Sequence, residues 1–195
     1  MPGFLRQHAG SPEVHAIVER LAEEIRMDPS NVDAVAATLQ RWIDEDRKHT
    51  DLKELQGMIW EEGFRKGAFR GHLYPDVVPF WNRARSRGLR LAIYSSGSVL
   101  AQQLLLKFSV EGDVSSLIER NYDTRVGSKS DVGSYRRIVE DVSVPPSEAL
   151  FYSDTVSELD AALSAGMRTC RLLRPGVQPT EHRHHEITDF TSELA

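Results

Sequence analysis

The chain has 195 residues, with 24 Lys and Arg against 29 Asp and Glu, and a formal net charge of −5. Because acids and bases are mixed along the sequence, the charge pattern excludes any electrostatic case for a nucleic acid or an anionic membrane surface as partner. No apolar run approaches the roughly 20 residues that span a bilayer. Cys170 is the single cysteine, which excludes an internal disulfide and favours a reducing compartment, so we expect a cytoplasmic protein.

Residues 1–70 have the pattern of helices only. Apolar residues recur at steps of three and four, on one face, in segments 12–25 and 32–47 and in a third segment that begins at residue 50 or 51. Glycines then end the pattern. We therefore expect residues 1–70 to form a helical block.

From Gly71 onward, short apolar strands alternate with helices. The spacing predicts parallel strands joined by helices, which is an α/β fold over residues 71–176. Three strands are few for such a sheet. Residues 177–195 are polar, and we expect a loosely ordered tail there. The predicted strands are 89–94, 149–152 and 167–173, and the predicted helices are 76–87, 98–108, 131–142 and 156–165.

Hydroxyl side chains follow the first predicted strand. Ser95 and Ser96 lead through a glycine directly into the next helix. The free N–H groups at a helix N-terminus and the helix dipole both favour a phosphate. A serine cap that does no more than begin the helix has the same sequence, so these residues alone leave both interpretations open.

Acidic side chains follow the second predicted strand, and a lysine precedes the helix between the two strands. Asp154 ends the strand and Glu158 lies four residues further on, an arrangement that suits Mg²⁺ but equally an ordinary helix cap. Lys129 could neutralise a transferring phosphoryl group, although most lysines are solvated surface residues. Together the hydroxyls, the acids and the lysine are typical of Mg²⁺-dependent phosphoryl transfer.

Longer stretches resemble the enolase-phosphatases, also called acireductone synthases, of the haloacid dehalogenase-like hydrolase superfamily. The resemblance implies a Rossmannoid parallel sheet with a helical cap, which residues 1–70 would form. It reaches from the N-terminus to Gly176. The stretches that carry it are WIDEDRK at 42–48, KELQGMIW at 53–60, YSSGSV at 94–99 and YDTR at 122–125.

The resemblance also implies an activity. Such enzymes act in methionine salvage, as monomers, on a small phosphorylated metabolite. They enolise and then dephosphorylate 2,3-diketo-5-methylthiopentyl 1-phosphate to an acireductone, and they require Mg²⁺. By analogy, Ser95 and Ser96 would bind the phosphate, Lys129 would steady the aspartyl-phosphate and the substrate, and Asp154 with Glu158 would hold the metal. No residue is identified as the base for enolisation.

The sequence departs from this family at its start. The family begins with a strand in the middle of the sheet that ends in an Asp-x-Glu-Gly-Thr-type motif, and the first Asp of that motif is the nucleophile. No such motif occurs in the 195 residues. We therefore expect the first core strand to be missing and the 195-residue chain to be inactive.

Two explanations remain for this departure: a longer protein, which the intact later motifs favour, and a truncated product. Two other functions also remain open. One is a non-catalytic relative that binds phosphorylated metabolites, and the other is a phosphatase of the same superfamily with another small substrate.

Overall fold

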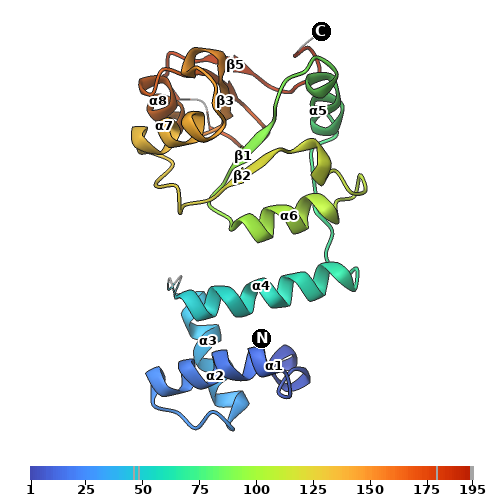
Figure 1. Cartoon of the computed structure of the whole chain (residues 1–195), viewed down its shortest axis with the longest axis vertical. Helices are drawn as coiled ribbons and strands as arrows, with labels where there is room; N and C mark the ends of the chain where they lie inside the picture. The colour runs from blue at the N-terminus through green and yellow to red at the C-terminus, as the bar shows by residue number, and fades with distance from the viewer. Residues whose placement is uncertain (46, 48, 179, 194–195) are drawn as a thin grey trace. The chain divides into compact units, whose positions relative to one another are not determined.

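The structure is a computed structural model that describes residues 1–45, 47, 49–178 and 180–193. Asp46 and Lys48, which belong to the stretch 42–48, lie outside the described residues. The chain divides into two compact units, unit 1 with residues 1–69 and unit 2 with residues 70–195 (Figure 1). Among the described residues, none of the helices combines the length and the apolar character that crossing a bilayer requires.

Unit 1 is helical, and three of its helices occupy the segments where the sequence predicts them, whereas the short first helix was not predicted. Pro12 begins the second helix, at a position where its missing N–H has no partner to lose. The Asn31 side chain caps the third helix by accepting the Ala34 N–H at 3.2 Å. The helices are α1 (Pro2–Gln7), α2 (Pro12–Ile25), α3 (Val32–Asp44) and α4 (Thr50–Arg65).

The apolar faces of α2, α3 and α4 meet in a core of their own. Leu21, Val35, Leu39 and Leu55 are fully buried there. Their three- and four-residue spacing along each helix explains why the helical period was readable in the sequence. Burial of each such side chain contributes about 1.5–3 kcal/mol to the free energy of unfolding. Because the buried residues of unit 1 form a cluster of their own, this unit has a hydrophobic core independent of the sheets.

Unit 2 is an α/β layer, which confirms the predicted fold class. The pairs β1–β2, β3–β4 and β4–β5 are all parallel. Its helices are α5 (Val77–Ser86), α6 (Val99–Lys107), α7 (Val132–Asp141) and α8 (Val156–Ser164), and its strands are β1 (Ala92–Tyr94), β2 (Arg120–Tyr122), β3 (Leu150–Ser153), β4 (Arg168–Leu172) and β5 (His185–Ile187).

The strands form two separate sheets, β1–β2 and β3–β4–β5, and no described strand pairs with the outer edge of β1 or of β3. One helix nevertheless packs against both. The Tyr135 ring of α7 lies 5.6 Å from the Tyr94 ring of β1 and 5.1 Å from the Phe151 ring of β3. The Tyr135 ring thus packs against both sheets, next to the edges of β1 and β3 that no described strand pairs with.

The C-terminal segment differs from the loosely ordered tail that its polarity predicted. β5 pairs with β4, and beyond it Phe190 is buried, with its ring stacked on Phe80 of α5 at 4.3 Å. The Phe190 N–H also donates to Asp76 at 2.7 Å. The segment is polar on average, but Ile187 pairs within the sheet and Phe190 packs into the core. β2 was missed for a related reason, because its sequence Arg-Asn-Tyr is not an apolar run.

Replacing Phe190 tests whether this segment belongs to the folded unit. Phe190→Ala removes the stacking on Phe80 and the edge contact with Tyr152, so we expect a loss of about 3 kcal/mol in the free energy of unfolding. Urea unfolding followed by circular dichroism measures it. Val110→Ala, at a side chain that is 56% exposed, is the control and should change stability by less than about 0.5 kcal/mol. Equal stability of the two variants would contradict the packing described.

Candidate functional site

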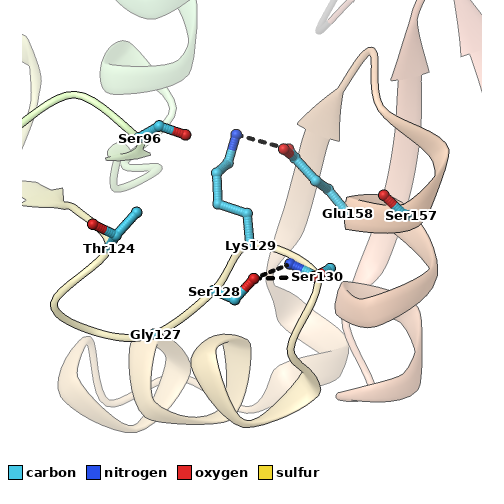
Figure 2. A pocket seen from close by; sticks show the side chains of 8 residues that line it. All are labelled: Ser96, Thr124, Gly127, Ser128, Lys129, Ser130, Ser157 and Glu158. Atoms are coloured by element: carbon cyan, nitrogen blue, oxygen red, sulfur yellow. Dashed lines mark hydrogen bonds and ion pairs between the residues drawn. The ribbon is translucent and has the colours of Figure 1, made fainter. Parts of the chain in front are cut away.

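An open cavity of about 530 Å³ lies where loops following β1, β2 and β3 converge (Figure 2). Ser96 comes from the loop after β1, Thr124 from the loop after β2, and Glu158 from the first turn of α8 after β3. Ligands of open α/β sheets bind outside the carboxyl ends of the strands, which is where this cavity lies. It is lined by Ser96, Thr124, Gly127, Ser128, Lys129, Ser130, Ser157 and Glu158.

An ion pair crosses the cavity. Lys129 Nζ lies 2.8 Å from Glu158 Oε2, and the two side chains extend toward each other from opposite walls (Figure 2). The same carboxylate oxygen accepts a hydrogen bond from the Ser153 hydroxyl at 2.8 Å. Both ends of the pair are mostly buried, with side-chain exposures of 23% and 14%. Glu158 therefore fixes the lysine ammonium in the middle of the site.

Two tyrosines hold the loop that carries Lys129. The Tyr94 hydroxyl donates to the Gly127 carbonyl at 2.9 Å, and the Tyr135 hydroxyl donates to the Lys129 carbonyl at 2.6 Å. Burial raises the pKa of both hydroxyls above the ordinary value, so both remain neutral donors at physiological pH. Gly127 adopts φ 135°, and a Cβ there would meet the Ser134 hydroxyl at 2.2 Å. A glycine is thus required where the loop turns.

The serine loop, residues 95–98, leads from β1 into α6. The Ser98 side chain caps α6 by accepting the Ala101 N–H at 3.2 Å, and the Ser95 hydroxyl accepts the Gly97 N–H at 3.1 Å. Among the described residues, the backbone N–H groups of Ser96 and Ser98 have no partner. Free N–H groups at a helix N-terminus together with hydroxyls can bind an anion.

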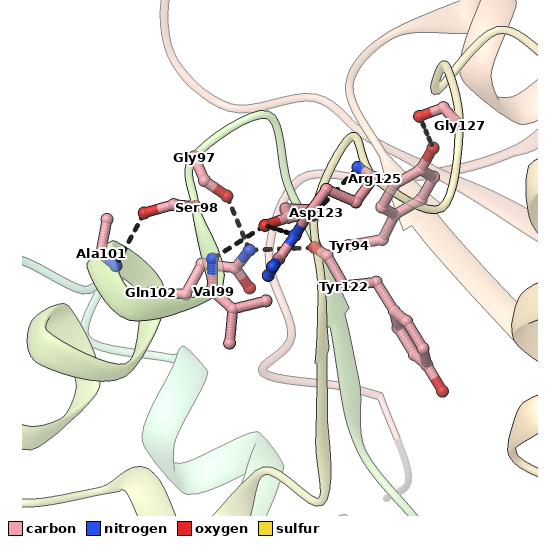
Figure 3. A network of polar contacts seen from close by, with 10 residues as sticks. All are labelled: Tyr94, Gly97, Ser98, Val99, Ala101, Gln102, Tyr122, Asp123, Arg125 and Gly127. Atoms are coloured by element: carbon pink, nitrogen blue, oxygen red, sulfur yellow. Dashed lines mark hydrogen bonds and ion pairs between the residues drawn. The ribbon is translucent and has the colours of Figure 1, made fainter. Parts of the chain in front are cut away.

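A buried aspartate outside the cavity supports this loop (Figure 3). Asp123, 7% exposed, accepts the Val99 N–H at 3.3 Å and the Arg125 N–H and Nε at 3.0 Å. Burial alone would raise its pKa, but the hydrogen bonds from Arg125 and Val99 outweigh burial and hold the pKa below the ordinary value. The carboxylate thus stays charged and joins the end of β2 to the start of α6.

Asp154 lies at the end of β3, exposed, and does not line the cavity. One carboxylate oxygen accepts the Thr155 hydroxyl at 3.0 Å. The described residues contain no group of three or more acidic, His or Cys side chains able to hold a metal. Mg²⁺ often takes one or two protein carboxylates and completes its shell with water and substrate phosphate. The exposed Asp154 carboxylate has the chemistry of one such ligand, whereas the Oε2 atom of Glu158 already pairs with Lys129.

The structure thus brings together three of the residues predicted from the sequence, Ser96, Lys129 and Glu158, in one cavity. Ser95 lies beside it in the serine loop, and Asp154 lies at the neighbouring strand end. Sequence reasoning missed the hydroxyls that accompany Lys129, although the alternation Gly127-Ser128-Lys129-Ser130 was a signal for them. Two of the supporting residues, Tyr94 and Asp123, fall in the stretches 94–99 and 122–125 that carry the family resemblance, but sequence reasoning gave none of the supporting residues a role. The supporting residues are Tyr94, Gln102, Asp123, Tyr135 and Ser153.

Comparison with known proteins identifies relatives over nearly the whole chain. A family model described as haloacid dehalogenase-like hydrolase matches residues 4–166. The chain is 43% identical to "Enolase-phosphatase E1" of Sorangium cellulosum over 197 aligned positions, which cover 100% of this chain and 85% of the relative. It is 48% identical to the protein of the same name from Stenotrophomonas maltophilia (strain R551-3), over 87% of this chain and 73% of that one.

Solved structures are also similar to this chain. The crystal structure of the UTR4 protein from Saccharomyces cerevisiae superposes with a TM-score of 0.79 at 31% identity, covering 90% of this chain and 80% of that chain. CbbY from Rhodobacter sphaeroides, crystallised in complex with phosphate, superposes with a TM-score of 0.58 at 20% identity, over 73% of this chain and 64% of that one. The second likeness concerns the fold alone.

The support that Asp123 gives to α6 predicts a particular pH dependence. Because its pKa is lowered in the folded state, its stabilisation is fully present above the unfolded-chain pKa of about 3.9 and is lost as the pH falls through the folded pKa. Asp123→Asn should therefore lower the free energy of unfolding by about 1 kcal/mol at neutral pH. The difference from the parent should shrink as the pH falls below about 4.

Denaturant unfolding at a series of pH values measures this difference. Asp154→Asn, at an exposed strand end, is the matched control and should stay within about 0.5 kcal/mol of the parent near neutral pH. A difference for Asp123→Asn that does not change with pH would show that its charge is not what stabilises the helix start.

Proposed function

Since the chain belongs to the haloacid dehalogenase-like hydrolases and, among them, to the enolase-phosphatases, we propose that it carries the site of a Mg²⁺-dependent enolase-phosphatase of methionine salvage. The substrate would be 2,3-diketo-5-methylthiopentyl 1-phosphate. Enolisation moves a proton from carbon to a carbonyl oxygen, and net hydrolysis of the phosphate ester then leaves inorganic phosphate and an acireductone. The observation that carries the proposal is the convergence of Ser96, Lys129 and Glu158 in one cavity.

Each residue of the site has a proposed task. Ser95 and Ser96, with the free N–H groups of their loop, bind the phosphate. Lys129 lies across the cavity, where its ammonium neutralises charge that develops on the transferring phosphoryl group. Asp154 would contribute to Mg²⁺, with Glu158 nearby to orient the lysine or the metal shell. When bound, the metal would withdraw charge from the phosphate oxygens.

The attacking group is proposed to come from a further strand that precedes residue 1 in a longer protein. Among the described residues, the only carboxylate that lines the cavity is Glu158, and Lys129 already pairs with it. The unpaired edges of β1 and β3 could receive one parallel strand between them. An aspartate at the end of such a strand would emerge between Ser96 and Glu158. As nucleophile it would attack phosphorus and break the ester P–O bond, so that the enol leaves and an aspartyl-phosphate forms, which water then hydrolyses to inorganic phosphate.

The proposed setting is cytoplasmic, with the protein acting as a monomer on a small phosphorylated metabolite. Unit 1 would serve as the cap that shields the reaction from water. A non-catalytic phosphate-binding relative is the second candidate, which the absence of an uncommitted carboxylate among the described lining residues favours.

Phosphate release from the diketo phosphate, with and without Mg²⁺, tests the proposal. We expect no release from the 195-residue chain and Mg²⁺-dependent release once the upstream coding segment is added. In the extended protein, Lys129→Ala should lower kcat/KM by about 100-fold or more, because it removes the cation of the cavity. Lys107→Ala, an exposed lysine of the same unit, is the control and should remain within about twofold.

The other outcomes separate the alternatives. Lys129-dependent release by the chain without the extension would show that an upstream aspartate is not needed. Release from other small phosphate esters but not from the diketo phosphate would assign another substrate. Phosphate binding without turnover of any ester by the extended protein would favour the non-catalytic relative.

A further inference from the structure

Gln102, in α6, is a buried polar residue that lies outside the cavity but contacts the serine loop. It is 7% exposed. Its side-chain nitrogen donates to the Gly97 carbonyl and to the Tyr122 carbonyl, each at 2.9 Å (Figure 3). Its side-chain oxygen accepts from the Asn121 side chain at 3.0 Å. Because carbonyls only accept, these contacts fix which way the amide is turned.

The contact with Gly97 restrains a whole peptide plane. The peptide bond is planar and trans, so the Gly97 carbonyl and the Ser98 N–H point in opposite directions. With the Gly97 carbonyl held by the buried Gln102 amide, the Ser98 N–H points to the opposite side of the peptide plane, and it has no partner among the described residues. The hydrogen bond therefore sets the direction of a free donor.

Little else restrains this plane. Gly97 has no side chain, and the nearest atom to a Cβ built there would be the Ser95 hydroxyl at 3.6 Å, an ordinary contact. A glycine peptide rotates more easily than any other. The Tyr122 carbonyl accepts both the Ser95 N–H at 3.0 Å and the Gln102 amide, so the start of the serine loop and the helix that follows the loop are anchored to one atom of β2.

We propose that Gln102 is a positioning residue for phosphate: it fixes the Gly97–Ser98 peptide plane so that the Ser98 N–H is presented to the bound phosphate. This inference rests on the proposed function of the serine loop. Gln102 is neutral, so its replacement changes the direction of the donor without changing the charge of the site. That separates it from Lys129, whose loss removes a charge.

Binding of inorganic phosphate to the 195-residue chain, by isothermal titration calorimetry at constant ionic strength, tests the proposal. Gln102→Met keeps the length of the side chain and removes its donors, and we expect about tenfold weaker binding. Gln103→Met, the same change at the exposed neighbouring glutamine, should leave the affinity within about twofold. All titrations are made well below the thermal unfolding transition of each variant.

A purely structural role for Gln102 would lower the unfolding temperature and leave the phosphate affinity unchanged, and that result overturns the proposal. If Gln102→Met does not fold, Asn121→Ala decides, because it removes only the contact that orients Gln102. About threefold weaker binding supports the proposal and unchanged binding overturns it. If the parent chain does not bind phosphate, or binds it equally well after Lys129→Ala, the phosphate site itself fails and this inference fails with it.

Discussion

The candidate site depends on the ring of Tyr135. This side chain is 1% exposed, and it packs edge-on against Tyr94 of the β1–β2 sheet and Phe151 of the β3–β4–β5 sheet. Its hydroxyl holds the Lys129 carbonyl. No hydrogen bond between strands joins β1 to β3 among the described residues, so side-chain packing sets the distance between their ends. The spacing of the serine loop and Glu158 follows from that packing.

Polar side chains around the site divide into those that face the cavity and those that hold backbone in place. Lys129 and Glu158 face it, whereas Gln102 and Asp123 bind carbonyl and N–H groups of the loops. A bound phosphate needs several donors aimed at one point, and loops that are rich in serine and glycine do not keep such an arrangement unaided. Buried, fully hydrogen-bonded side chains behind the loops supply the rigidity.

Sequence reasoning predicted the helical block, the parallel α/β class and the strand ends from which Ser96 and Glu158 come, because apolar periodicity and strand-to-helix transitions are local signals. It did not find β2 or β5, which are three residues long and polar in part. Nor did it find Tyr135 or Gln102 as parts of the site. Their importance lies in contacts between segments, such as that of Tyr135 with Phe151, which no local pattern encodes.

The charges of the cavity explain why the proposed chemistry calls for a metal. Among the described residues that line the cavity, the formal charges of Lys129 and Glu158 cancel. A phosphate ester carries close to two negative charges near neutral pH, and burying that charge without a counter-charge is strongly unfavourable. Backbone donors of the serine loop offset part of it. A divalent cation beside Asp154 would offset more of this charge, which is the role that the proposed function gives to Mg²⁺.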